Sequence, residues 1–193
     1  EPGDCKGRWA EIFGNGNPIY LEIGCGKGNF ITKHAFAEPD CNFIACEGQM
    51  SVVLRALEKA EASGSGNLRV FIDFVNDLED YFEVGELSGI YLNFSDPWPK
   101  ARHAKRRLTY RGRLQNYKKV LKPDGFIVFK TDNEGLFAFT IEEIEACGYE
   151  MIEMSRDLHG EAQGVHGEKS RCFMTEYEEK FSGQGKNINF VRF

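Results

Sequence analysis

The sequence lacks the features of membrane and secreted proteins. None of its 193 residues belongs to an apolar run that approaches the roughly 20 residues needed to span a bilayer. It also shows no secretory signal peptide. We therefore expect a cytoplasmic protein with no membrane partner. Because the chain begins at Glu1 and not at a methionine, we also expect a further segment to precede it.

Closely paired cysteines are missing as well. The six cysteines form no C-x-x-C pair, and the two nearest in sequence, Cys41 and Cys46, would share one strand. Structural zinc sites usually take two tight pairs of ligands. The sequence therefore predicts reduced thiols, as in most cytosolic proteins, and no metal site.

Positive charge is scarce overall but concentrated in one segment. The net charge of −6 argues against a protein that binds nucleic acid over its whole surface. From Lys100 to Lys122, however, ten residues are Lys or Arg and none is Asp or Glu. Such a segment on an acidic body can hold phosphates while the rest of the surface repels non-specific contacts.

Apolar residues alternate between strand and helix periods, without repeats or low-complexity stretches. The expected strands are 19–23, 42–46, 68–72, 89–94, 126–130, 149–154 and 188–193. The expected helices are one that carries Phe30, Ile31, His34 and Ala35, and three at 49–62, 109–121 and 134–147. We expect a turn at 122–125 and a mobile loop at 156–171. This alternation predicts one α/β domain over residues 1–193, with a doubly wound, mostly parallel, Rossmann-like sheet of seven strands.

The first expected strand ends in a glycine cluster that opens the next helix. Gly24, Gly26 and Gly28 let the backbone turn sharply and let a ligand approach closely. Their spacing departs from the dinucleotide fingerprint G-x-G-x-x-G, because Asn29 stands where the third glycine belongs. Glu22, before the first glycine, suits a cationic ligand such as S-adenosylmethionine better than a pyrophosphate. We therefore expect Glu22, Gly24 and Gly26 to bind that cofactor; turn glycines without a ligand are the alternative.

Acidic residues also end the next two strands. Glu47 lies about 20 residues beyond the glycine cluster, where a carboxylate can accept hydrogen bonds from both ribose hydroxyls. After the third strand, we expect Asp73 to accept a hydrogen bond from the adenine amine and Phe74 to pack against the adenine. A surface carboxylate is an equally good interpretation of Asp73.

The run Asp96-Pro97-Trp98-Pro99 follows the fourth strand. Two prolines restrict the backbone, so Asp96 is held rigidly beside the expected crevice and Trp98 can pack against a base. A core tryptophan and a capping aspartate are the alternative. The basic residues that follow are candidates for contacts with RNA phosphates, although a solvated basic helix face is also possible. These candidates are Arg102, Lys105, Arg106 and Arg107.

These motifs resemble those of the bacterial tRNA (guanine-N7)-methyltransferases, a family of class I S-adenosylmethionine-dependent methyltransferases. The resemblance covers nearly the whole chain, through LEIGCGKGNF, ACEGQ, YLNFSDPWPKARHAKRRLT, LKPDGFIVFKTDN and TEYEEKF. It implies that Glu22, Glu47 and Asp96 contact the cofactor, that Asp96 is also catalytic, and that the target is guanosine 46 in the variable loop of tRNA. The substrate contacts that it implies are Lys100, Asp132, Thr175, Glu176, Tyr177 and Glu178.

The sequence departs from the family pattern in two places. Phe74 stands where the family usually carries a small or acidic polar residue, so Asp73 is expected to substitute in the adenine site. The basic segment that often precedes the domain in this family is not in the sequence. In addition, the T-x-x-E run from Thr175 to Glu178 fits a helix capping box as well as a substrate contact. The sequence is compatible with a monomer or a homodimer.

The sequence leaves three alternative classes of function. A methyltransferase acting on an adenine or cytosine amine would carry an Asp/Asn-Pro-Pro-aromatic loop, whereas Trp98 replaces the second proline here. A nicotinamide oxidoreductase would need the missing glycine spacing. A non-catalytic RNA-binding module would not need the full set of Glu22, Glu47, Asp96 and Asp132.

Overall fold

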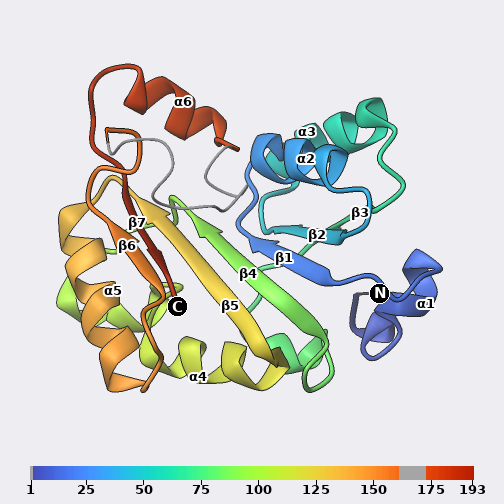
Figure 1. The fold of residues 1–193 in the computed structure, drawn as a ribbon, viewed down its shortest axis with the longest axis horizontal. Coiled ribbons are helices and arrows are strands. Elements are labelled where there is room, and N and C mark those ends of the chain that lie inside the picture. The colour runs from blue at the N-terminus through green and yellow to red at the C-terminus, as the bar shows by residue number, and fades with distance from the viewer. Residues whose placement is uncertain (1, 161–172) are drawn as a thin grey trace.

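The computed structural model describes residues 2–160 and 173–193, and in this part of the chain seven strands form one sheet (Figure 1). The order across the sheet is β3-β2-β1-β4-β5-β7-β6. The first five strands are parallel, and β7 runs antiparallel to both β5 and β6. The strands are β1 (Ile19–Ile23), β2 (Asn42–Glu47), β3 (Leu68–Ile72), β4 (Leu87–Asn93), β5 (Leu121–Thr131), β6 (Glu153–Ser155) and β7 (Asn189–Arg192). The predicted doubly wound, mostly parallel sheet is confirmed.

Helices cover both faces of the sheet (Figure 1). They are α1 (Trp9–Phe13), α2 (Asn29–Ala37), α3 (Met50–Ser63), α4 (Arg111–Val120), α5 (Glu134–Ala146) and α6 (Glu176–Ser182). Three short 3-10 helices span Pro2–Cys5, Leu78–Asp80 and Ala101–Arg106. Within the described residues, no helix is both long and apolar enough to cross a bilayer.

The sheet has a buried hydrophobic core on each face, because successive side chains of a strand point to opposite sides. In β2, Ile44 belongs to the core under α1, α4 and α5, whereas Phe43 belongs to the core under α2 and α3. All five strand residues from Ile19 to Ile23 are buried or half-buried, as a central parallel strand requires.

The strand order reverses beside β1, which pairs with β2 on one side and β4 on the other. In open α/β sheets, ligands bind outside the carboxyl ends of the strands at such a switch point. The glycine cluster follows β1 and the Asp96 loop follows β4, so the fold brings these two motifs to the same edge.

Several predicted boundaries were wrong. The turn expected at 122–125 lies within β5 as an irregularity, since the pairing passes from Leu87–Leu121 to Gly89–Phe126. The strand expected at 149–154 begins only at Glu153. Tyr149 instead packs inward: its hydroxyl donates to the Leu114 carbonyl at 2.8 Å.

Part of the chain was expected to be a mobile loop. Of residues 156–171, those from 161 onward lie outside the described residues, as does Cys172.

Five cysteines are free thiols, as predicted: Cys5, Cys25, Cys41, Cys46 and Cys147.

Candidate active site

Among the described residues, three adjoining cavities lie at the carboxyl edge of the sheet. Their volumes are about 690, 400 and 300 Å³, within the range of ligand sites. Phe94 lines all three, and Asp96 lines both the 690 Å³ and the 400 Å³ cavity. Asp96 is exposed. The predicted catalytic carboxylate therefore stands at the border between the two larger spaces.

The glycine cluster forms one wall of the 300 Å³ cavity. Gly24 and Gly26 have φ angles of 74° and 55°, and no atom lies within 4 Å of where a β-carbon would be. Their backbone therefore faces open space that a ligand can fill. Gly28 has a different role, because a β-carbon there would lie only 2.9 Å from Cβ of Ala56 in α3.

The Glu47 carboxylate braces the glycine cluster and also faces the largest cavity. One of its oxygens accepts a hydrogen bond from the Gly26 amide, and the other accepts one from the Gln49 amide, both at 3.0 Å. Glu47 lines the 690 Å³ cavity. This position fits the predicted contact with ribose.

Glu22 is buried, with 1% of its surface exposed, and is not among the residues that line the three cavities. Burial raises the pKa of Glu22 to about 8, against the lowering effect of a hydrogen bond from Asn93. That bond joins Asn93 Nδ2 to Glu22 Oε1 at 2.8 Å. Asn93 lines the 690 and 300 Å³ cavities, so it stands between Glu22 and the crevice. Sequence reasoning missed Asn93, although a polar residue ending an apolar strand was a usable signal.

The expected adenine residues both line the 690 Å³ cavity. Phe74 is 69% exposed, and its ring lies so close to Gly48 that a β-carbon there would be 2.3 Å from a ring atom. Asp73 accepts a hydrogen bond from the Tyr81 hydroxyl at 2.6 Å. Burial, together with the Asp73 carboxylate, raises the pKa of Tyr81, so the hydroxyl stays a donor. Asp73 is therefore already partnered within the protein, although its other oxygen can accept a further bond.

The four basic candidates do not form one surface. Arg102 is exposed, while Lys105 and Arg106 line the 690 Å³ cavity, where the Arg106 guanidinium lies 4.7 Å from the centre of the Trp98 ring. Arg107 turns inward instead and donates to the carbonyls of Pro97 and Trp98, both at 3.0 Å. The structure therefore does not favour Arg107 as a phosphate contact. Lys100 is exposed and lies outside the residues that line the three cavities.

Asp132 lines the 400 Å³ cavity together with Asp96. Its Oδ2 accepts hydrogen bonds from the Tyr177 hydroxyl at 3.0 Å and from Lys186 Nζ at 3.3 Å. Burial, and then the hydrogen bond to Asp132, raises the pKa of Tyr177. The fold thus brings Asp96, Asp132 and Tyr177 from distant segments to the lining of one cavity. Lys186 was not predicted.

Helix α6 begins at the crevice and carries the other predicted substrate residues. Thr175 and Glu178 form the capping box: each side chain accepts a hydrogen bond from the other residue's backbone amide. Thr175, Glu176 and Tyr177 line the 300 Å³ cavity. Glu178 is fully buried, and its carboxylate pairs with the equally buried Lys130 of β5 at 3.2 Å. The structure therefore gives Glu178 an anchoring position behind the cavity wall.

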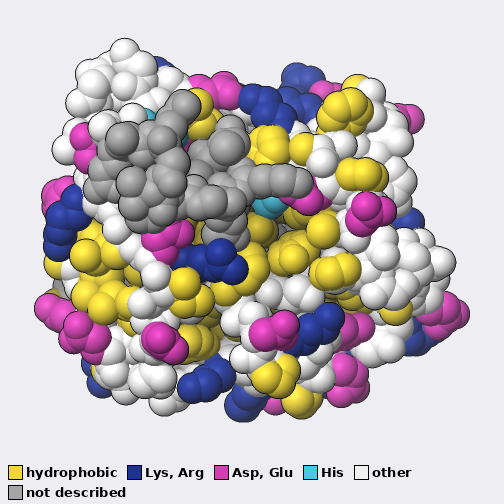
Figure 2. Space-filling model, viewed as in Figure 1, with side chains coloured by type: hydrophobic (Ala, Val, Ile, Leu, Met, Phe, Trp, Pro, Cys, Tyr) yellow, Lys and Arg dark blue, Asp and Glu magenta, His cyan; other side chains and the backbone are white. Residues whose placement is uncertain are grey.

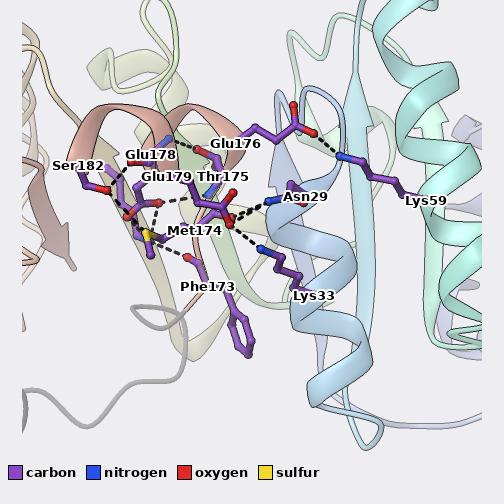
Figure 3. Close-up of polar contacts among 11 residues, drawn as sticks. Asn29, Lys33, Lys59, Phe173, Met174, Thr175, Glu176, Glu178, Glu179 and Ser182 are labelled. Carbon is purple, nitrogen blue, oxygen red and sulfur yellow. Dashed lines mark hydrogen bonds and ion pairs between the residues drawn. The ribbon is translucent and has the colours of Figure 1, made fainter. Parts of the chain in front are cut away.

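Surface ion pairs bind the other side of α6 to α2 and α3. Figure 3 shows Lys33 and Lys59 pointing from these helices toward Glu179 and Glu176. The Lys33–Glu179 distance is 2.6 Å. The hydrogen bond from Lys59 is the main cause that lowers the pKa of Glu176. Helix α6 is thus held by a buried ion pair with β5 and by surface ion pairs with α2 and α3. The start of α6 lines the same 300 Å³ cavity as the glycine cluster.

The sequence is similar to known methyltransferases over almost its whole length. Residues 16–191 match the family model described as "Putative methyltransferase". A tRNA (guanine-N(7)-)-methyltransferase of Lactococcus lactis subsp. cremoris (strain MG1363) is 46% identical over 97% of this chain and 84% of its own length. One from Streptococcus suis (strain 05ZYH33) is also 46% identical, over 97% of this chain and 85% of its own length.

Solved methyltransferase structures share the fold at low identity. The 16S rRNA methyltransferase KamB superposes with a TM-score of 0.67 at 10% identity, covering 96% of this chain and 91% of its own. A SAM-dependent methyltransferase from Aquifex aeolicus gives a TM-score of 0.61 at 15% identity, covering 96% and 87%.

Proposed function

The chain belongs to the family of tRNA (guanine-N(7)-)-methyltransferases, and we infer that it transfers a methyl group from S-adenosylmethionine to N7 of guanine in tRNA. Within the site, the main support for this proposal is the position of Asp96, which lines both the 690 Å³ and the 400 Å³ cavity. One cavity then holds the cofactor and the other the guanine. We further propose guanosine 46 of the variable loop as the acceptor, the cytoplasm as the location, and a monomer or homodimer as the acting form.

The residues of the crevice fit S-adenosylmethionine. Gly24 and Gly26 leave open space beside their backbone. Within the described residues, Asn93 Oδ1 and Glu22 Oε2 are buried without a hydrogen-bond partner. Asn93 lines two of the cavities, so its Oδ1 is a spare acceptor for the ammonium group of the cofactor, and Glu22 lies behind it. In our proposal Glu47 accepts hydrogen bonds from the ribose, and Phe74 packs against the adenine.

When bound, S-adenosylmethionine supplies an electrophilic methyl group. Guanine N7 has a free lone pair and no proton to lose, so the protein needs no general base for the transfer. Its residues must instead hold the guanine in line with the methyl group, and such positioning can supply on the order of 7–11 kcal/mol of the barrier. Methylation leaves positive charge on the purine, which the carboxylates of Asp96 and Asp132 stabilise while accepting hydrogen bonds from guanine N1 and N2.

The target base must leave its stack to reach this site. N7 faces the deep, narrow groove of an RNA helix, which side chains reach poorly. We therefore propose that the guanine is extruded into the 400 Å³ cavity, next to the loop that carries Trp98. A complex with RNA in which the target guanine remained stacked would contradict this step.

The test is a transfer assay with labelled S-adenosylmethionine and unmodified tRNA. Aniline cleavage at 7-methylguanosine then maps the modified position, which we expect to be guanosine 46. Asp96→Ala should abolish the signal while the thermal unfolding temperature stays close to that of the wild type, because Asp96 is exposed. Arg55→Gln, which changes an exposed residue of α3 outside the three cavities, is the matched control.

Two outcomes would overturn the proposal. Full activity of Asp96→Ala would remove this carboxylate from the mechanism. Tight binding of tRNA by the wild type without any transfer would identify a non-catalytic RNA-binding module instead.

A further inference from the structure

The loop that carries Asp96 has a strained backbone at both ends. Phe94 has a φ angle of 51° and Trp98 one of 42°. Bulky residues rarely adopt positive φ, and this strained conformation persists only where the surrounding structure holds it in place. Contacts from elsewhere in the fold must therefore stabilise this loop.

Arg107 supplies such contacts directly. Its Nε donates to the Pro97 carbonyl and its Nη2 to the Trp98 carbonyl, both at 3.0 Å. The planar guanidinium presents its N–H groups in a fixed fork, so it can bind two adjacent carbonyls at once. These carbonyls belong to the two residues that directly follow Asp96. The orientation of the loop is thereby linked to that of Arg107.

The Arg107 guanidinium is in turn fixed against α5. Its central carbon lies 4.3 Å from the centre of the Phe139 ring, a cation–π contact. Glu143, on the same helix, is close enough for the Arg107 charge to act on it, although the main partner of Glu143 is Arg111 at 2.7 Å. Helix α5 therefore gives Arg107 both an aromatic surface and a compensating charge.

We propose that Arg107 is a positioning residue, which holds the Pro97 and Trp98 carbonyls so that Asp96 stays at the border between the 690 and 400 Å³ cavities. This inference rests on the proposed function, in which Asp96 acts on the guanine. This role distinguishes Arg107 from Arg102, Lys105 and Arg106, whose exposed side chains remain the candidates for phosphate contacts.

Kinetics distinguish positioning from phosphate binding. Arg107→Met should lower kcat by about 100-fold, because a displacement of the Asp96 carboxylate by about 1 Å can have an effect of this size. The KM for S-adenosylmethionine and the KM for tRNA should each change by less than about threefold. Arg107→Lys should have a kcat between those of Arg107→Met and the wild type, because an ammonium group cannot reproduce the pair of hydrogen bonds that the guanidinium donates to the two carbonyls. Arg102→Met, by contrast, should raise KM for tRNA and reduce the salt dependence of tRNA binding by roughly one phosphate contact.

A spectroscopic measurement tests the geometry even if activity is absent or Arg107→Met folds poorly. The chain has only two tryptophans, so 5-fluorotryptophan labelling gives two fluorine NMR signals, which Trp98→Phe assigns. Arg107→Lys should shift or broaden the Trp98 signal and leave the Trp9 signal unchanged. Arg55→Lys, on α3, should alter neither.

The proposal fails if the Trp98 signal of Arg107→Lys matches that of the wild type. It also fails if Arg107→Met keeps the wild-type kcat, or raises KM for tRNA and reduces the salt dependence as Arg102→Met does. An inactive wild-type protein would instead refute the proposed function, and the fluorine spectra would still decide whether Arg107 orders the loop.

Discussion

Single residues at this site owe their chemistry to their degree of burial. Glu22 and Asp96 are both carboxylates at the ends of neighbouring strands, yet only Glu22 is removed from water. Burial penalises the charged form, which is why the pKa of Glu22 rises to about 8. Glu22 is therefore mainly protonated at neutral pH in the protein without ligand, and the cationic cofactor is expected to favour its ionised form.

This burial predicts a pH-dependent stability. Between the ordinary pKa of 4.5 and the folded value of about 8, the folded protein keeps a proton that the unfolded chain has released. The contribution of Glu22 to the free energy of unfolding therefore falls as the pH rises through this window, by at most about 1.4 kcal/mol per pH unit. Glu22→Gln should remove this slope.

Urea unfolding of Glu22→Gln and the wild type at pH 5, 6, 7 and 8 measures the effect. The stability of the variant relative to the wild type should increase with pH. Glu58→Gln, at an exposed position of α3, is the control and should show a constant difference. A constant difference for Glu22→Gln as well would mean that the buried carboxylate titrates normally.

Among the elements, α6 is a short helix whose side chains pair with residues distant in sequence. It has only seven residues, too few for a stable isolated helix, so its position depends on tertiary contacts. The capping box organises its first turn, and the Lys130–Glu178 pair fixes it to β5. Because Thr175, Glu176 and Tyr177 line the 300 Å³ cavity, the attachment of α6 also shapes the crevice.

The two sides of this attachment should differ in strength. Lys130→Met leaves the Glu178 carboxylate buried with one partner fewer, a change that typically costs about 3–5 kcal/mol. Lys33→Met removes an exposed ion pair with Glu179, typically worth 1 kcal/mol or less. Denaturant unfolding and hydrogen exchange of the α6 amides compare the two variants. Equal losses would show that the buried pair does not anchor the helix.

Across the whole molecule, basic residues are clustered in the sequence, whereas positive and negative side chains are mixed on the surface. Figure 2 shows positive and negative side chains interspersed over one face. The overall charge is −6, although residues 100–122 carry no acidic group. Several basic side chains of that segment are compensated by acids from elsewhere, as Arg111 is by Glu143 and Lys119 by Glu79. The surface available for phosphates is therefore smaller than the sequence count implies.

Binding to tRNA should therefore involve few phosphates. We expect the affinity for tRNA to fall with salt concentration, and the double variant Arg102→Gln, Lys105→Gln to reduce the slope of log K against log salt by roughly 1–2. Lys119→Gln, whose side chain pairs with Glu79 at 2.6 Å, is the matched control and should leave the slope unchanged. Binding titrations at several salt concentrations provide the slopes; identical slopes for wild type and double variant would exclude these two side chains as phosphate contacts.

The alternation of strands and helices and the positions of the main motifs could be predicted from local sequence patterns. The strands at 19–23 and 68–72 match the buried strand β1 and the half-buried edge strand β3, because both are short, mainly apolar runs. Glu47 and Asp96 could be predicted to lie near one another because parallel strands bring their carboxyl ends to one edge of the sheet. The capping box at Thr175 was found because its two residues are close in sequence.

Which of these side chains face the crevice depends on tertiary contacts that local patterns do not report. Arg106 and Arg107 are adjacent and chemically identical, but Arg106 lies over Trp98 while Arg107 binds the loop carbonyls and packs on Phe139. The buried contacts of Asn93 with Glu22 and of Lys130 with Glu178 likewise join segments far apart in the chain. Periodicity along a sequence reports the local backbone, whereas burial and pairing depend on elements that meet only after the chain has folded.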